Sequence, residues 1–137
     1  MGESRFLKVV RLSAWYDLLV TWPFALPWTF APLHEHLGRI AAALQMRGSI
    51  APLDATQVLF ANLLGSVVIV WSLARILAPS VRLGRLDALA RALFASWQVY
   101  AVHSGMSTVV LFFTAFEVLF GLLQASPVRA NRAAQRP

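Results

Sequence analysis

Four long apolar segments occupy most of this chain of 137 residues, and each is interrupted by only one or two ionisable or amide side chains. They cover residues 12–33, 57–78, 88–102 and 108–124. A helix needs about 20 residues, within a range of roughly 17–25, to cross the hydrocarbon core of a bilayer, and the segments are near this length or at its short end. The pattern predicts an all-α fold, an integral membrane bundle of four spanning helices.

The composition favours the same class of protein. The hydrophobic fraction is 58%, the mean hydropathy is +0.64 and charged residues make up 13%. Soluble domains have about 45–50% apolar and about 25% charged residues, so a soluble fold of this chain would have too little polar surface to cover four helices. No linker separates the segments, which indicates one domain over residues 1–125. Residues 126–137, rich in Ala, Arg, Asn and Gln, are expected to form a basic flexible cytoplasmic tail.

The basic residues lie almost entirely on one side of the predicted spans. Only Arg39 and Arg47 of the twelve Lys and Arg residues fall in the first loop, and none falls between residues 102 and 108. The others lie before the first segment, between or in the facing ends of the second and third, or after the fourth: Arg5, Lys8, Arg11, Arg75, Arg82, Arg85, Arg91, Arg129, Arg132 and Arg136. Cytoplasmic loops are rich in Lys and Arg, so we expect both termini in the cytoplasm. The small size and the Arg- and Ala-rich composition favour a bacterial inner membrane. The formal charge of +6 is then expected to contact anionic lipid headgroups, not nucleic acid.

The first segment contains two prolines, Pro23 and Pro27. A proline within a helix removes a backbone donor and clashes with the preceding turn, so we expect a kink or unwinding in the outer half of this segment. In lipid, the freed carbonyl groups need partners from protein or water. This stretch is therefore expected to face a neighbouring helix or a cavity.

The loop over residues 33–54 is long for so small a bundle. Leu37, Ile40 and Leu44 follow helical spacing within it, which predicts an amphipathic helix lying along the outer interface of the membrane. Asp54 and Gln57 then indicate the beginning of the second spanning helix, because an acidic N-cap followed by Gln at the third helical position is typical of a helix start.

Polar residues follow one face of the second and third segments. Asn62, Gly65 and Ser66 predict close approach of another backbone, with the amide hydrogen-bonding across. In the third segment, Asp87, Arg91 and Gln98 form one stripe. We expect Asp87 to lie at the headgroups with Arg85, and Arg91 to extend its side chain toward the cytoplasm.

Four ionisable residues from four segments are expected to reach a similar depth. At about 1.5 Å per residue, Asp17 and Glu117 lie roughly 8 and 10 Å from the cytoplasmic ends of their helices. Arg75 and Arg91 lie about one turn into theirs. A charge at the centre of a spanning helix costs about 2.5–3.5 kcal/mol on insertion scales and usually faces the bundle interior, where it pairs. We therefore expect these four residues to meet.

Two interpretations of this cluster remain open. In the first, Asp17 and Glu117 are neutralised by Arg91 and by a charge partner, Arg75, and the cluster fixes the register of the helices. In the second, burial penalises the charged form of a carboxylate, which then holds a proton and serves a ligand site or a proton path. The candidate ligand-binding or proton-linked residues are Asp17, Asn62, Arg91, Gln98 and Glu117.

Other kinds of site find little support. The chain has no cysteine, which excludes disulfide, thiol and haem-attachment chemistry. His34 and His36 flank Glu35, but neighbouring positions diverge around a helix, and no third ligand has suitable spacing. Gly-rich phosphate loops and nucleotide fingerprints are absent from the sequence. We expect no metal and no cofactor.

The chain resembles the small bacterial DoxX-like membrane proteins. The resemblance rests on four short spans, on Arg11 followed by Asp17, on the polar and small face at Asn62 and Gly65, and on Glu117 in the last segment. It implies a four-helix membrane bundle and supplies no catalytic residue. The chain is also similar to small multidrug-resistance exporters in having four helices and an acid in the first. It departs from them in its long first loop, its two prolines and its second acid.

Three functional classes follow from these observations. The first is a non-enzymatic accessory or small-molecule-binding module of the inner membrane, with a lipophilic ligand or a membrane-protein partner. The second is a proton-coupled transporter that acts as a homo-oligomer. The third is an intramembrane enzyme acting on a lipophilic substrate, with Glu117 or Asp17 as acid or base.

Overall fold

The computed structural model describes residues 1–129. Of the predicted tail 126–137, residues 130–137 lie outside this description. The described residues form five α-helices and two short 3-10 helices and contain no extended strand. The α-helices are α1 (Glu3–Thr21), α2 (Pro27–Ala43), α3 (Ala55–Leu77), α4 (Val81–His103) and α5 (Leu111–Ala125), and the 3-10 helices are η1 (Trp22–Ala25) and η2 (Thr108–Val110).

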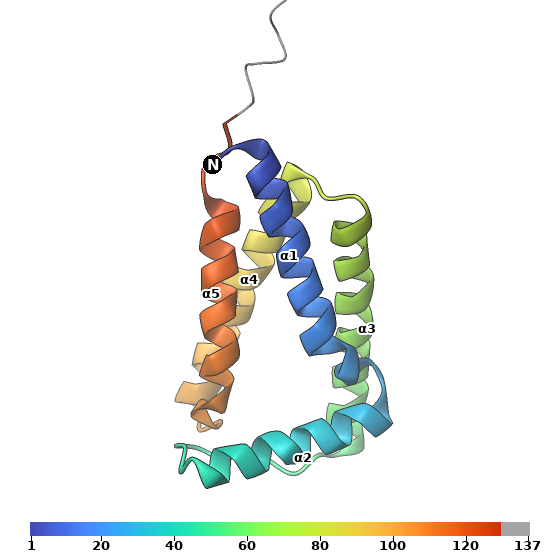
Figure 1. Cartoon of the computed structure of the whole chain (residues 1–137). Helices are drawn as coiled ribbons and strands as arrows, with labels where there is room; N and C mark the ends of the chain where they lie inside the picture. Colours follow the sequence, from blue (N-terminus) through green and yellow to red (C-terminus); the bar gives the residue numbers. More distant parts are fainter. Residues whose placement is uncertain (130–137) are drawn as a thin grey trace, which may run out of the picture.

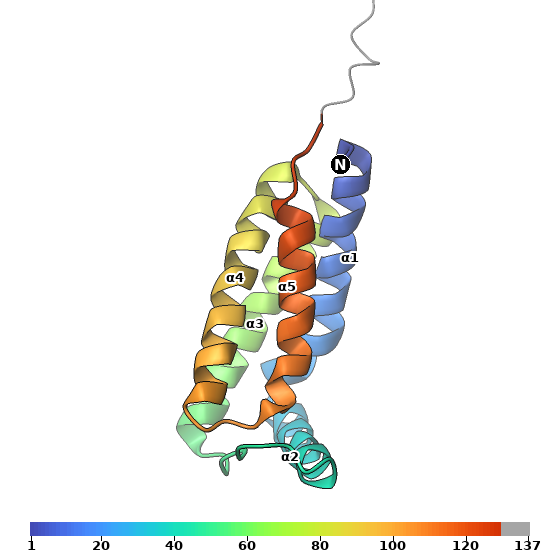
Figure 2. The ribbon, with the colours of Figure 1, turned by 90° about the vertical axis from the view of Figure 1, so that its left-hand side faces the viewer.

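Four of the α-helices run along the length of the molecule, and α2 lies across one end (Figure 1). α1 packs mainly against α3, and α4 packs mainly against α5. The view in Figure 2 shows α4 and α5 side by side, with α2 seen nearly along its axis beneath them. The N-terminus, the α3–α4 loop and the end of α5 share the end of the molecule opposite α2. There the amino group of Met1 donates to the carbonyl oxygen of Pro127 at 2.7 Å.

The first apolar segment, residues 12–33, is divided between two helices, which confirms the unwinding expected at Pro23 and Pro27. α1 ends at Thr21, η1 carries the chain through Pro23, and α2 begins at Pro27 and changes direction. Proline is accommodated in the first turn of a helix, where its missing N–H would have no partner, and this explains why a new helix begins there. The helix predicted around residues 37–44 is the second half of α2.

The break in the chain packs against α3. The carbonyl oxygen of Phe24 accepts a 2.7 Å hydrogen bond from Nδ2 of Asn62, and that of Pro23 accepts one of 2.7 Å from the hydroxyl of Thr29. A Cβ atom on Gly65 would lie only 2.5 Å from the backbone nitrogen of Ala25. Asn62 and Gly65 therefore allow the close backbone approach expected of them, and their neighbour is η1.

Polar caps fix where α3 and α4 begin. Asp54 Oδ1 accepts from the backbone N–H of Gln57 at 2.8 Å, and Oε1 of Gln57 accepts from the backbone N–H of Asp54 at 3.0 Å. This reciprocal pair satisfies two of the free N–H groups of the helix start. Ser80 Oγ accepts from Leu83 N at 3.1 Å, so α4 begins at Val81, two turns before the apolar segment. Asp87 consequently lies inside the helix.

The start of α1 packs on the start of α4. Phe6 and Val10 are fully buried, and a Cβ on Gly84 would lie 2.7 Å from Phe6 Cε1 and 2.6 Å from Val10 Cγ2. The next residue, Arg85, lies over the ring of Phe6 and donates to the carbonyl oxygen of Gln124 at 2.8 Å. A cation at the last carbonyl groups of a helix is favourable, so Arg85 stabilises the end of α5.

Two of the helical segments in residues 1–129 are long and apolar enough to cross a membrane by length and composition. They are α3 and the stretch Thr108–Ala125 made of η2 and α5. By the same criteria of length and apolar composition, α1 and α4 are not candidate spans. Both carry additional ionisable residues, such as Lys8 and Arg11 in α1 and Arg82 in α4.

Replacing Gly65 with alanine tests the contact between η1 and α3. The added methyl group would meet backbone atoms of Phe24 and Ala25, which cannot move aside without shifting η1. We expect Gly65→Ala to lower the free energy of unfolding by about 1–3 kcal/mol. Gly38→Ala in α2 is the control, because nothing lies within 4 Å of its added Cβ. Thermal unfolding of the two purified variants measures the difference, and equal stability would contradict the packing described.

Candidate functional site

Five charged side chains from four helices meet inside the bundle, and we call them the ion cluster. Asp17 comes from α1, Arg75 from α3, Asp87 and Arg91 from α4, and Glu117 from α5. Arg75 lies in the last turn of α3 and Asp87 in the second turn of α4. The ion cluster therefore lies in the part of the bundle nearer the α3–α4 loop.

Four members of the ion cluster form a closed ring of alternating charge. Oδ2 of Asp17 accepts from Nη2 of Arg75 and from Nη2 of Arg91, both at 2.6 Å. Oδ2 of Asp87 lies 2.6 Å from Nη1 of Arg75 and accepts from Nε of Arg91 at 3.0 Å. Each guanidinium contacts two carboxylates and each carboxylate contacts two guanidiniums, so the ring is electrically neutral.

Glu117 is attached to this ring from one side. Its Oε2 accepts from Nη1 of Arg91 at 2.8 Å. The guanidinium of Arg91 therefore contacts all three carboxylates of the ion cluster, and it also lies over the ring of Phe120, 5.1 Å from the centroid. Its rigid fork of N–H donors suits this role, because the donors can address several carboxylate oxygens at once.

The ring joins the two helix pairs. Arg75 of α3 contacts Asp17 of its own pair and Asp87 of the other, while Arg91 of α4 contacts Asp87 on its own helix and Asp17 of the other pair. Two of the four ring contacts therefore cross from α1 and α3 to α4. Moving one pair against the other would separate buried opposite charges.

Neutral polar groups surround the ring. Trp71 Nε1 donates to Oδ1 of Asp87 at 2.9 Å. The hydroxyl of Ser13 accepts from Nε2 of Gln124 at 2.7 Å and from Nη1 of Arg75 at 3.4 Å. Trp71 and Ser13 were not identified from the sequence. For Ser13 the available signal was spacing, since it lies four residues before Asp17 on the same helix face, as Gln124 lies seven after Glu117.

Burial differs among the charged side chains. Arg75, Arg91 and Asp87 are 0%, 2% and 3% exposed, whereas Asp17 and Glu117 are 13% and 12% exposed. Asp17 and Glu117 are thus the members of the ion cluster that the surroundings can reach. Beside them, Tyr16 of α1 stacks on Phe116 of α5, with ring centroids 4.9 Å apart.

The structure brings together only part of the predicted polar pocket. Asp17, Arg91 and Glu117 meet, with Arg75 as a partner, as the depth argument expects. Asn62 binds the carbonyl oxygen of Phe24, and Gln98 Oε1 accepts from the hydroxyl of Thr114 at 2.7 Å. Asn62 thus links α3 to η1, and Gln98 links α4 to α5, and neither contacts the ion cluster.

Asp87 joins the ion cluster, which the depth argument had built from four residues without it. Because α4 begins at Val81, Asp87 lies one turn before Arg91 on the same face, and both point into the bundle. Their neighbours supply opposite charges on Asp17 and Arg75, which compensates for the loss of water.

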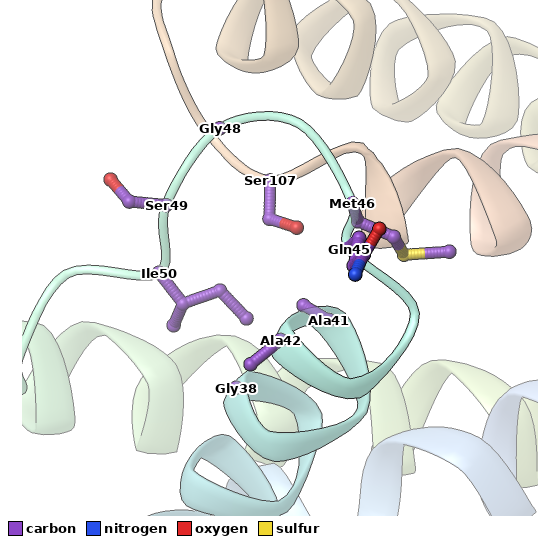
Figure 3. A pocket seen from close by; sticks show the side chains of 9 residues that line it. All are labelled: Gly38, Ala41, Ala42, Gln45, Met46, Gly48, Ser49, Ile50 and Ser107. Carbon is purple, nitrogen blue, oxygen red and sulfur yellow. The ribbon is translucent and has the colours of Figure 1, made fainter.

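Two cavities lie near α2, and none of the five predicted pocket residues lines either. One, of about 220 Å³, lies between the C-terminal half of α2 and the loop that follows it (Figure 3). Its lining consists mostly of small side chains: Gly38, Ala41, Ala42, Gln45, Met46, Gly48, Ser49, Ile50 and Ser107. The other, of about 530 Å³, borders His34, Glu35 and Arg39. Both are open spaces at the surface of the molecule.

Comparison of the chain with protein-family models, with characterised proteins and with solved structures finds no match.

Removing Arg91 should be far more damaging than removing an exposed arginine. Arg91→Met leaves three carboxylates with one remaining guanidinium, and breaking a buried ion pair costs about 3–5 kcal/mol. Arg39→Met is the matched control, because Arg39 and Glu35 form a pair whose side chains are largely exposed, and such pairs are worth about 0.2–1 kcal/mol. Thermal unfolding of the purified variants compares the two, and similar losses would argue against the ring as a stabilising element.

A double-mutant cycle measures the contact between Arg91 and Glu117 separately. We expect Glu117→Ala and Arg91→Met to be non-additive, because the second change no longer breaks the 2.8 Å contact that the first has removed. Strict additivity of the two changes in free energy of unfolding would be incompatible with this contact.

Proposed function

We propose that this chain is an integral protein of the bacterial inner membrane, in which α1, α3, α4 and α5 cross the bilayer and both termini lie in the cytoplasm. In this proposal it is a non-enzymatic accessory module, which offers an apolar surface to lipid and to a membrane-protein partner or a second copy of itself. The observation that carries the proposal is the distribution of residues, with charges inside and apolar side chains outside.

The outer surface of the helices supports membrane insertion. Of the apolar stretch of α3, only 17% is buried within the chain, and for Thr108–Ala125 the share is 22%. The core helix of a soluble protein would be mostly buried. Large apolar side chains are exposed along α3, α4 and α5, among them Phe60, Val67, Val70, Leu89, Trp97, Phe112 and Leu122. Soluble monomers rarely expose continuous apolar surface of this extent.

The ion cluster explains how the more polar helices could also cross. Asp17 in α1, and Asp87 and Arg91 in α4, are the charges deepest in these helices, and all three are paired inside the bundle. Ionisable residues within membrane spans usually face the interior and pair in this way. α3 and α4 each have 23 residues, which gives a length of about 35 Å, enough for a hydrocarbon core of about 30 Å.

The position of α2 fits the outer interface. It lies across the bundle, where a helix parallel to the membrane plane would lie (Figure 1). Trp28 in its first turn is 71% exposed, and Glu35 and Arg39 form an exposed ion pair on it. Tryptophan is enriched at the interface between lipid and water, and a charged face suits the aqueous side.

An accessory role is favoured over binding of a small molecule in the predicted pocket. The ring groups bind one another, and Asn62 and Gln98 bind partners elsewhere in the bundle. The polar side chains expected to recognise a ligand therefore already form hydrogen bonds or ion pairs with other residues of the chain. Contacts with a partner would instead use the apolar helix surfaces.

Reporter fusions test the topology. Fusions after Ser80 and after Ser126 should report the cytoplasm, and a fusion after Gly48 should report the opposite side, because the basic residues cluster at the first two positions. A periplasmic signal after Ser126 would exclude the four-span arrangement.

A lysine placed on the outer face of α3 tests whether this face contacts lipid. Val67 is near the middle of α3 and 65% exposed, so Val67→Lys would be nearly neutral in water but costs about 2.5–3.5 kcal/mol at the centre of a membrane span. We expect it to reduce membrane integration strongly. Leu77→Lys is the control, because Leu77 ends α3 and is 80% exposed, and a lysine there can reach the headgroups. Equal integration of the two variants would refute the proposed depth of Val67.

A further inference from the structure

The ion cluster contains one carboxylate more than its guanidiniums can neutralise. Asp17, Asp87 and Glu117 face Arg75 and Arg91, so the formal charge is −1 when all five groups are ionised. An uncompensated charge in a buried site is costly, and such a group tends to neutralise instead. The imbalance is a property of the chain's own residues, and lipid around the bundle would make an uncompensated charge there still more costly.

The surplus falls on Glu117. Each aspartate of the ring contacts both guanidiniums, through distances of 2.6–3.0 Å. Glu117 contacts Arg91 alone, through Oε2, and Arg91 is shared with both aspartates. Its carboxylate therefore has the least compensation of the three.

Hydrogen bonding near the ion cluster is also short of donors. Oε1 of Gln124 is buried and accepts no hydrogen bond from the described residues, although the side chain is fully enclosed. The amide is directed at the ion cluster, because its Nε2 donates to Ser13 Oγ, which also accepts from Arg75. Gln124 lies seven residues after Glu117 on α5, on the same face. Gln124 lies about two turns, roughly 10 Å, along α5 from Glu117, so this missing donor is separate from the surplus carboxylate.

The titratable and charged groups around Glu117 come from three helices. α1 contributes Tyr16 and Asp17, α3 contributes Arg75, and α4 contributes Asp87 and Arg91. The short helix η2, which packs on α5, has the sequence TVV and contributes none. Both guanidiniums in this set are already bound by the aspartates of the ring.

We propose that Glu117 is a proton-binding site, which holds one proton in the folded protein at neutral pH. The proton resides on Oε1, which leaves Oε2 to accept from Arg91. The three carboxyl groups then carry two negative charges against two guanidiniums, and the ion cluster is neutral. Because the Glu117 side chain is 12% exposed and that of Asp17 is 13% exposed, the proton can exchange with the surroundings while the ring stays closed.

Infrared spectroscopy of the full chain in detergent tests this site directly. At pH 7 an ordinary glutamate, which ionises near about pH 4, contributes no carboxylic acid band. We expect a carboxylic acid C=O stretch equivalent to one group per chain. It should shift when glutamate carboxyl groups are labelled with ¹³C and stay in place when only aspartate is labelled. The other glutamates, Glu3 and Glu35, are exposed, so a shifted band belongs to Glu117. The labelling needs no variant and so cannot fail through misfolding.

Variants that change the number of charged groups in the ion cluster should change the number of protonated carboxyl groups per chain. Glu117→Gln should remove the band, Arg75→Gln should raise it to two groups per chain, and Glu35→Gln, the same replacement at an exposed site, should leave it unchanged. Absence of the band from the unmodified chain at pH 7 would overturn the proposal. A band that shifts with aspartate labelling, or that survives Glu117→Gln in a helical, monodisperse sample, would do so as well.

Discussion

Neutralisation of buried charge is the constraint on which the rest of this fold depends. Arg75 and Arg91 are almost completely enclosed, and taking a guanidinium out of water costs several kcal/mol unless its donors are used. In the ring, carboxylates from α1 and α4 accept from the guanidinium groups of α3 and α4 and compensate for this cost. Because two of the ring contacts, Arg75–Asp87 and Arg91–Asp17, cross between the pairs α1–α3 and α4–α5, the two pairs form the complete ring in one register. A buried salt bridge adds little net stability compared with apolar packing, but a broken one is severely destabilising, so the ring mainly selects one arrangement over others.

Much of the fold could be predicted from the sequence, and the reasons for the failures are local. Segment length and apolar composition predicted α3 and α5 closely, and counting residues from the basic ends predicted that Asp17, Arg75, Arg91 and Glu117 would meet. Asp87 was left out of the predicted cluster because hydropathy marks where a helix becomes apolar, not where its N-cap lies. Ser80 caps α4, which begins two turns before its apolar part. Asn62 and Gln98 were assigned to a pocket because periodicity identifies a polar face without identifying the neighbour that the face meets.

The two ends of the molecule are held by different means. At the end with the ion cluster, the contacts are mainly between opposite charges. At the α2 end, backbone hydrogen bonds join the loop after α2 to the turn between α4 and α5: Ser49 N donates to Gly105 O, and Thr108 N donates to Arg47 O. Gly48 adopts a positive φ of 83° there, which other residues rarely adopt. α2 is thus connected to both helix pairs, to one through η1 and to the other through this turn.

The break at η1 has a consequence for the order of assembly. Residues 12–33 form an apolar stretch long enough to enter a membrane as one continuous helix, yet in the finished protein they are divided between α1 and α2. The partner for the Phe24 carbonyl oxygen, Asn62, and the space that admits the backbone at Ala25, at Gly65, both belong to α3, which is synthesised later. In lipid an unpaired carbonyl group is costly. The N-terminal region can therefore reach its final shape only when α3 lies beside it; in the proposed membrane topology, this means that the first helix matures after α3 is inserted.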